Sequence, residues 1–329
     1  MENRSIRELA LDMGFSEVGF CGADGFGKQR TMVEMQPELA ERRQLRYEPE
    51  ADFPWAKSIV VLLWAYHPAP MPDHPGQVFI DSYYQASNQA YHAAKRLEEA
   101  LIEQGVQARA NVSYPAKTAA VRAGLGVIGD NGLLITPMFG TRVVIILMAI
   151  DAETTRSKTL DGMNDCLHCG KCIAACPVAA LDAQGMTNPE RCLRNYMMEG
   201  IIVPPEVRSK MGNGLIGCDR CQRVCPMQTM AERPLERKFM LDEIVTDDAA
   251  LFKASVGALA QQIGRNAARP QRVRAQAAIL AGNRGSAEDL PVLRHWAEST
   301  FEAVREHARW AIKRIESHMQ GLDQSHETR

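Results

Sequence analysis

The sequence predicts an α+β chain made of three consecutive parts. Two apolar runs rich in β-branched residues, 58–66 and 142–150, predict buried strands of an N-terminal α/β unit. Eight of the nine cysteines lie between positions 166 and 225 and predict a compact cysteine-rich unit. The rest of the chain has a helical pattern. The three parts are predicted to span residues 1–150, 151–235 and 236–329.

The composition is that of a globular protein with a sizeable core, at 329 residues with 46% hydrophobic and 24% charged side chains. The formal net charge of −2 gives no overall attraction to nucleic acid or to a membrane, so either partner would need a local patch. We find no apolar run of about 18 residues and no apolar segment of the signal-peptide type. We therefore expect a cytoplasmic protein without a membrane partner, in which thiols stay reduced.

Helices are predicted on either side of the first apolar run. Residues 1–14 have an amphipathic pattern, and Gly14 can end that helix. A second helix is predicted over residues 87–105, with Ser87 as its N-cap and Gly105 at its end.

A glycine-rich segment, 111–140, precedes the second apolar run. Its closely spaced glycines would let the backbone approach a flat or bulky ligand. They are Gly124, Gly126, Gly129 and Gly132. The letters G-x-G-x-x-G occur at 124–129, but a helical pattern precedes them and a strand follows, which is the reverse of a dinucleotide-binding turn. We therefore reject a Rossmann site, and a purely structural turn stays open as the alternative to a ligand site.

The cysteines follow the spacing of a bacterial two-cluster ferredoxin. The first run, 166–177, is C-x2-C-x2-C-x3-C-P, and the second run, 218–226, is C-x2-C-x3-C-P, with Cys192 between them. In the first type of run, three cysteines bind one [4Fe–4S] cluster and the fourth binds the other cluster. We therefore predict a ferredoxin-like unit with two [4Fe–4S] clusters.

This spacing assigns four thiolates to each cluster. The ligands predicted for the first cluster are Cys166, Cys169, Cys172 and Cys225. The ligands predicted for the second cluster are Cys176, Cys192, Cys218 and Cys221. Disulfides are disfavoured in a reducing compartment, and two tetrahedral zinc sites would not require this spacing.

The ninth cysteine and a histidine within the pattern are not predicted as ligands. Cys21 follows the apolar run EVGF and is expected to be a buried strand residue. His168, between two predicted ligands, is expected to be a hydrogen-bond donor beside the cluster or an exposed side chain.

The last part of the chain contains a short internal repeat. The sequence VRAQA at 273–277 recurs 31 residues later as VREHA at 304–308, which predicts a short HEAT-like helical solenoid. Residues 264–285 also carry arginines and no acidic residue. These arginines are Arg265, Arg269, Arg272, Arg274 and Arg284. They form either a solvated helix face or a phosphate-contacting surface for RNA.

Taken together, these segments resemble the epoxyqueuosine reductase family of cobalamin-dependent iron–sulfur enzymes. The most specific matches are RCLRNYMMEG at 191–200, KMGNGLIGCDRCQRVCP at 210–226, and AGLGVIG at 123–129. The resemblance implies that the N-terminal unit holds cobalamin, that electrons pass through the two clusters to cobalt, and that the helical tail binds tRNA. It implies reductive removal of the epoxide oxygen in queuosine formation. The corrinoid contacts expected on this basis are Gly126, Gly129, Asn131, Leu134 and Ile135.

The sequence departs from the family where an aspartate is expected as proton donor. The family places an Asp-x-x-Pro motif ahead of AGLG, and here Val112 or Ala110 stands at that point. The segment 129–143 is also similar to the cobalamin-facing stretch of reductive dehalogenases, which use a tyrosine aided by a basic side chain. Tyr114 and Lys117 are therefore predicted as catalytic residues, with the ammonium lowering the pKa of the phenol.

Three functions are compatible with the sequence. We favour a corrinoid-dependent reductase that acts on tRNA or, in a dehalogenase-like manner, on a small molecule. An electron-transfer protein without its own substrate would hold clusters but no cobalamin, and an RNA-binding module would use the clusters structurally. The reductase requires an external low-potential electron donor and is expected to be a monomer.

Overall fold

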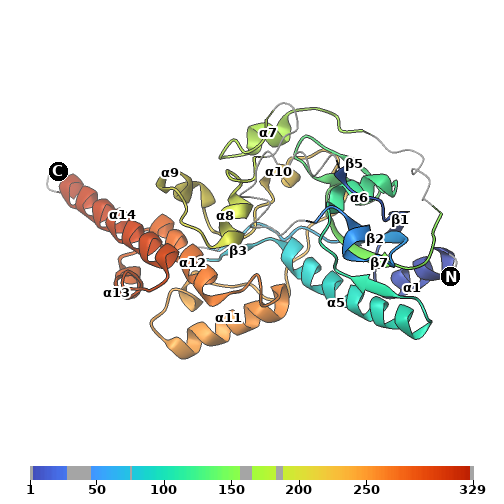
Figure 1. Ribbon diagram of the computed structural model, residues 1–329. Helices are drawn as coiled ribbons and strands as arrows, with labels where there is room; N and C mark the ends of the chain where they lie inside the picture. The colour runs from blue at the N-terminus through green and yellow to red at the C-terminus, as the bar shows by residue number, and fades with distance from the viewer. Residues whose placement is uncertain (1–2, 28–45, 75, 156–164, 183–187, 327–329) are drawn as a thin grey trace. The chain divides into compact units, whose positions relative to one another are not determined.

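The computed structural model describes residues 3–27, 46–74, 76–155, 165–182 and 188–326. The chain divides into two compact units (Figure 1). The first consists of Met1–His67, Ala86–Gly170 and Cys225–Met230. The second consists of Pro68–Gln85, Lys171–Val224 and Ala231–Arg329. Both units therefore contain segments that are distant in sequence, and their limits differ from the consecutive parts predicted above.

The first unit is built on a four-stranded sheet in which all neighbouring strands are antiparallel. Its order is β1 (Glu17–Gly22), β2 (Ser58–Ala65), β7 (Val143–Ile150) and β4 (Ala108–Ala110). The two predicted strands are thus confirmed and lie side by side, with Val61 opposite Leu147. Cys21 is a buried residue of β1, as expected. Apolar side chains on both faces of β2 explain why its sequence does not alternate.

The helices in this part of the chain are α1 (Asn3–Asp12), α4 (Pro49–Asp52), α5 (Ser82–Glu103) and α6 (Ala116–Arg122). Of these, α1 contacts β1, and α6 contacts β1, β2 and β7. Both predicted helices are confirmed, but Ser87 lies inside α5 and is not its N-cap, because the helix already begins at Ser82. Gly14 and Gly105 follow α1 and α5 with positive φ angles of 97° and 81°, which is the usual way in which glycine ends a helix.

The second unit is mainly helical. Its short sheet pairs β3 (Phe79–Ile80) with β8 (Gly214–Ile216) in parallel. The helices around the cysteines are α7 (Lys171–Ala175), α8 (Leu193–Glu199), α9 (Pro205–Arg208) and α10 (Arg220–Arg223). The later helices are α11 (Ala249–Ile263), α12 (Pro270–Arg284), α13 (Leu290–Trp296) and α14 (Glu302–His326). None of the helices in the described part of the chain has the length and apolarity that a membrane span requires.

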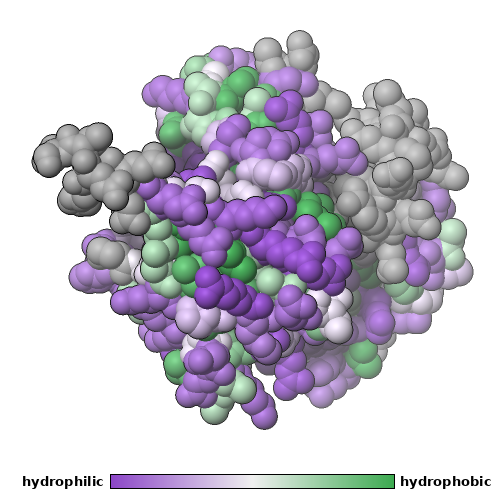
Figure 2. All heavy atoms as spheres, turned by 90° about the vertical axis from the view of Figure 1, so that its left-hand side faces the viewer, coloured by the Kyte–Doolittle hydropathy of each residue, from purple (hydrophilic) through white to green (hydrophobic). Residues whose placement is uncertain are grey.

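The two copies of the internal repeat lie on α12 and α14, which pack against each other. The equivalent pairs Val273 and Val304, and Ala277 and Ala308, are all buried in one apolar core. The repeat therefore reflects two helices that present the same small apolar face. Figure 2 shows the side of this unit on which α13 and α14 lie: its surface is mostly hydrophilic, with small separate groups of apolar side chains.

A buried histidine joins the two copies of the repeat. The ring of His307 on α14 is fully buried, and its Nδ1 lies 2.9 Å from the carbonyl oxygen of Ala275 on α12. The backbone N–H of Val203 donates to Nε2 at 2.9 Å. Because a carbonyl only accepts and an amide only donates, the ring must be the neutral tautomer with its proton on Nδ1. Burial lowers the pKa of His307 from 6.5 to about 4.

We expect this histidine to make the second unit acid-sensitive. The unfolded chain takes up the proton near pH 6.5, whereas the folded chain does so only near pH 4, so the stabilising effect is complete above 6.5 and is lost as the pH falls toward 4. The loss is on the order of 3 kcal/mol. Urea unfolding of wild type and His307→Gln at several pH values measures it. The variant should lose this part of the pH dependence, and identical slopes for both proteins would contradict the assignment.

Candidate metal centre and reaction site

Four of the predicted cluster ligands come together inside the second unit. Cys192 is the residue before α8, Cys218 and Cys221 flank the start of α10, and Cys176 follows α7. Three of them, Cys176, Cys192 and Cys218, pack against one apolar group that includes Leu193. The backbone N–H of Ala180 donates to the Cys176 sulfur at 3.2 Å, an interaction of the kind that tunes an iron–sulfur centre.

The surroundings of these thiols disfavour their ionisation. Burial raises the pKa of Cys218 to about 11, with a further contribution from Cys192. Burial also raises the pKa of Cys221, and Cys218 and Cys192 act on it in the same direction. Cys172 and Cys176 add to this effect on Cys221. Such a crowded set of buried thiols can ionise together only when a cationic centre compensates their charge, which suits an iron–sulfur cluster.

A second group of thiols gathers inside the first unit. Burial raises the pKa of Cys225, and the neighbouring Cys166 and Cys169 raise it further, so the end of the second cysteine run lies beside the start of the first. The remaining ligand predicted for the first cluster, Cys172, belongs to the second unit and lies on α7. Three of the four thiols predicted for the first cluster are thus grouped within one unit.

The loop before β7 holds the segment that carries Cys225. The hydroxyl of Thr229 donates to the carbonyl oxygen of Met138 at 2.9 Å. Gly140 has a φ angle of 54°, and a Cβ there would collide with the carbonyl oxygen of Met227. A larger residue at position 140 would therefore push this segment away, which gives Gly140 a specific packing role.

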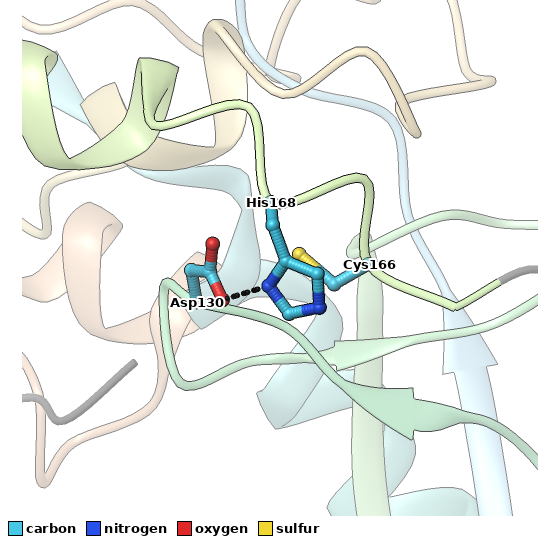
Figure 3. A group of neighbouring side chains, drawn as sticks. All are labelled: Asp130, Cys166 and His168. Atoms are coloured by element: carbon cyan, nitrogen blue, oxygen red, sulfur yellow. Dashed lines mark hydrogen bonds and ion pairs between the residues drawn. The ribbon is translucent and has the colours of Figure 1, made fainter. Parts of the chain in front are cut away.

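An aspartate and a histidine lie beside the first thiol of the same group (Figure 3). His168 Nδ1 is 2.8 Å from an Asp130 carboxylate oxygen, and ligand atoms of Asp130, Cys166 and His168 all lie within 4.8 Å of one another. The Asp130 side chain is only 12% exposed, whereas that of His168 is 68% exposed. The expectation of an exposed His168 is confirmed. The three side chains could hold a cation only if Cys166 were not committed to the cluster.

The five expected corrinoid contacts are all buried within the first unit. Gly126 and Gly129 flank β5 (Val127–Ile128), which pairs with β6 (Leu134–Ile135) in a small hairpin. A Cβ at Gly126 would collide with the backbone oxygen of Ile135, and one at Gly129 would lie 2.7 Å from the Ile135 side chain. These glycines therefore permit close packing within the hairpin, the alternative left open by the sequence.

The polar and exposed residues of this hairpin have different roles. Asn131 is buried, and its side-chain oxygen accepts a hydrogen bond from the Leu133 N–H at 3.1 Å, which shapes the turn. Ile128 in β5 and Met138, which follows the hairpin, are exposed apolar residues, at 43% and 68% exposure. The sequence reasoning missed both, because isolated apolar residues next to a strand look like core.

Tyr114 is a buried core residue with one polar partner. Its ring stacks on Phe26 with centroids 5.9 Å apart, and its hydroxyl donates to an Asp52 carboxylate oxygen at 2.9 Å. Burial, the hydrogen bond to Asp52 and the charge of Asp52 raise the pKa of Tyr114, whereas Arg46 lowers it slightly. The predicted lowering of the phenol pKa by Lys117 is therefore wrong, because burial and a carboxylate dominate its surroundings.

The partners of this pair come from segments that the sequence did not connect. Asp52 ends α4, is partly exposed, and forms an ion pair with Arg46 at 2.8 Å. The backbone N–H of Arg46 donates to the carbonyl oxygen of Ser113 at 3.2 Å, which aligns the two segments. The exposed Lys117 donates from Nζ to the carbonyl oxygen of Gly132 and so ties α6 to the hairpin. No sequence signal identifies Asp52.

Comparison with known proteins agrees with this geometry. Residues 165–228 match the family of 4Fe-4S double cluster binding domains. An epoxyqueuosine reductase of Bacillus subtilis is 30% identical over 67% of this chain, and an epoxyqueuosine reductase of Lactococcus garvieae is 26% identical over 95% of it. The chain belongs to the epoxyqueuosine reductase family. The alignments cover 62% and 95% of those two relatives, so for the Bacillus relative the match leaves out more than a third of the protein.

The fold is also that of epoxyqueuosine reductase. A crystal structure of epoxyqueuosine reductase with an epoxyqueuosine-modified tRNA stem loop superimposes with a TM-score of 0.77 at 23% identity, over 99% of this chain and 94% of that one. The family assignment places a double [4Fe–4S] cluster domain over the two thiol groups described above. The order of elements predicted around these glycines is also observed, since α6 precedes the hairpin and a strand follows the glycines.

Proposed function

We propose that this protein is a cobalamin-dependent iron–sulfur reductase that removes the epoxide oxygen from epoxyqueuosine in tRNA. The observation that carries the proposal is the gathering of the cysteines into two thiol groups within a fold shared with epoxyqueuosine reductase. Such a reaction replaces the epoxide by a carbon–carbon double bond and releases water, and it consumes two electrons and two protons. The chain must therefore provide an electron path and a proton source.

The electron path is assigned to the cysteines. We propose that Cys176, Cys192, Cys218 and Cys221 hold one cluster, as their mutual burial favours. The other cluster is assigned to Cys166, Cys169, Cys172 and Cys225, supported by the effect of two of these thiols on Cys225. We retain the functional division into a corrinoid-binding region within 1–150, a cluster region within 151–235 and a HEAT-like tail within 236–329. Ligand thiols that must stay reduced favour a cytoplasmic site of action.

The corrinoid is assigned to the exposed side of the glycine-rich hairpin. When bound, cobalamin supplies the cobalt that breaks the carbon–oxygen bond. The buried residues Gly126, Gly129, Asn131, Leu134 and Ile135 would shape this surface from beneath. Ile128 and Met138 offer exposed apolar side chains, which suit the flat apolar edge of a corrin ring.

The proton source is assigned to Tyr114 together with Asp52. The phenol is held at 2.9 Å from a carboxylate, in the segment where the family carries its aspartate and this chain has Val112. The raised pKa keeps the phenol protonated at neutral pH, so that it carries a proton for the departing oxygen, but it also makes the phenol a weaker acid than a free tyrosine. Lys117 serves as a positioning residue through its contact with Gly132.

Binding of tRNA is assigned to part of the arginine-rich stretch. Arg274 lies over the Phe252 ring at 4.1 Å, and Arg284 pairs with Asp242 and Asp289, so both have structural roles. Arg272 donates to the carbonyl oxygen of Asn266 at 2.5 Å. Arg265 and Arg269 are exposed and are the residues that we propose contact phosphate.

Cobalamin binding tests the proposal most directly. We expect the protein, reconstituted with iron and sulfide without oxygen and then desalted after addition of cobalamin, to retain about one cobalt per chain. Cobalt analysis and the EPR spectrum of Co(II) provide the measurement. Full iron content without retained cobalt would instead identify a two-cluster electron-transfer protein. Retained cobalt without turnover of epoxyqueuosine tRNA would favour the small-molecule alternative.

A further inference from the structure

We propose that Asp130, held in place by His168, lowers the reduction potential of the first iron–sulfur cluster. The inference concerns the pair drawn in Figure 3 and rests on the assignment of Cys166 to that cluster. Neither Asp130 nor His168 belongs to the cysteine pattern, and the proposed reductase activity assigns neither of them a role.

The geometry places a carboxylate next to a cluster ligand. The ligand atoms of Asp130 and Cys166 lie within 4.8 Å of each other, and the Asp130 side chain is 12% exposed, so water screens its charge poorly. An electron added to the cluster resides partly on its sulfur ligands. A negative charge at this distance opposes that addition, and net charge near the cluster is one of the main determinants of its potential.

His168 is the residue that fixes the carboxylate in this position. It lies between Cys166 and Cys169 in the chain and adopts a φ angle of 48°, which is uncommon for a non-glycine residue. This conformation directs its ring to Asp130, 2.8 Å away, while most of the ring stays exposed. The loop that carries Cys166 and Cys169 thus also holds a carboxylate of the glycine-rich hairpin in place, as hydrogen-bond partners beside other metal centres hold the groups around the metal.

A lower potential changes how readily the first cluster gives up an electron. A cluster with a lower potential is a stronger reductant, so the pair would favour electron release from the first cluster over electron retention. Asp130 and His168 are positioning and tuning residues in this proposal, since neither touches the substrate.

Potentiometric EPR titration of the reconstituted protein at one fixed pH tests the inference. We expect Asp130→Asn to raise the midpoint potential of one cluster and leave the other unchanged. The ratio of reduced to oxidised cluster at a given applied potential should rise about tenfold, which is about 59 mV for a one-electron couple. Glu99→Gln is the matched control, because it removes the same charge from the exposed side of α5. Equal shifts in both variants, or no shift in Asp130→Asn, would overturn the proposal.

The clamping role of His168 is tested by a double-mutant cycle. Asparagine tolerates a positive φ angle, so His168→Asn removes the ring without straining the loop. In that background Asp130→Asn should change the potential by clearly less than in wild type. An equal change in both backgrounds would overturn the role of His168. Iron analysis before each titration verifies the clusters, and the titration needs neither cobalamin nor tRNA, so its failure is distinguishable from failure of the proposed reductase.

Discussion

Replacement of Cys192 by alanine is expected to remove one entire iron–sulfur cluster. Cys192 stands alone in the sequence, yet its thiol acts on the pKa of both Cys218 and Cys221 within the second unit. Its loss leaves only three of the four thiolates that are assigned to this cluster. Because cluster assembly and folding are coupled, the unit that buries these thiols should also lose stability.

Iron analysis and EPR after anaerobic reconstitution measure this effect. The iron content should fall from about eight to about four atoms per chain, because each cluster holds four. Cys21→Ala is the matched control, since Cys21 is a thiol of β1 in the first unit that is assigned to no cluster, and it is more buried than Cys192. It should keep the full iron content. Full iron in Cys192→Ala would contradict the ligand assignment of the second cluster.

Removal of the Tyr114 hydroxyl is expected to have the second large effect. Tyr114→Phe keeps the ring that stacks on Phe26 but loses the proton that is donated to Asp52. General acid catalysis typically contributes about 10²–10⁴-fold, and single-turnover conversion of epoxyqueuosine tRNA should slow by that order. Because the pKa of Tyr114 is raised, the phenol stays protonated through the neutral range, and the ratio of the two rates should not change across it.

A second buried tyrosine provides the control that distinguishes a catalytic role of Tyr114 from a packing role. Tyr84 is buried to the same extent, at 4% exposure, and its hydroxyl accepts a hydrogen bond from Arg194 at 3.0 Å in the second unit. Tyr84→Phe should leave the single-turnover rate within about threefold of wild type. If Tyr114→Phe behaves in the same way, Tyr114 is a packing residue and the proton must come from elsewhere. Asp52→Asn then shows whether the carboxyl acts without the phenol.

The sequence predicted those features that are encoded over short distances along the chain. The ligand spacing of the cysteines is local, and the structure places Cys166 and Cys169 beside Cys225, whereas Cys172 lies beside Cys221. The buried strands and the helix α6 were predicted for the same reason, since each is a continuous pattern. The start of α5 was misplaced because Ser87 has the chemistry of a cap but is preceded by five residues that also fit a helix.

The reaction site depends on contacts that no local pattern encodes. Tyr114 and Asp52 are 62 positions apart, and Asp130 and His168 are 38 apart. The glycines did not decide between a ligand site and a structural turn for a different physical reason. A residue without a side chain leaves room for a ligand and for a neighbouring strand equally well. Only the position of Ile135 against Gly126 decides between these two uses.

The return of residues 225–230 to the first unit has a consequence for biosynthesis. Thr229 reaches the loop at Met138, and Met227 fills the space that Gly140 leaves open. The first unit therefore lacks one of its segments while the ribosome is still translating the cysteine-rich region. It can be completed only after position 230 has emerged, when all eight cysteines of that region have been synthesised. The order of translation thus delays completion of this unit until all eight predicted iron ligands are outside the exit tunnel.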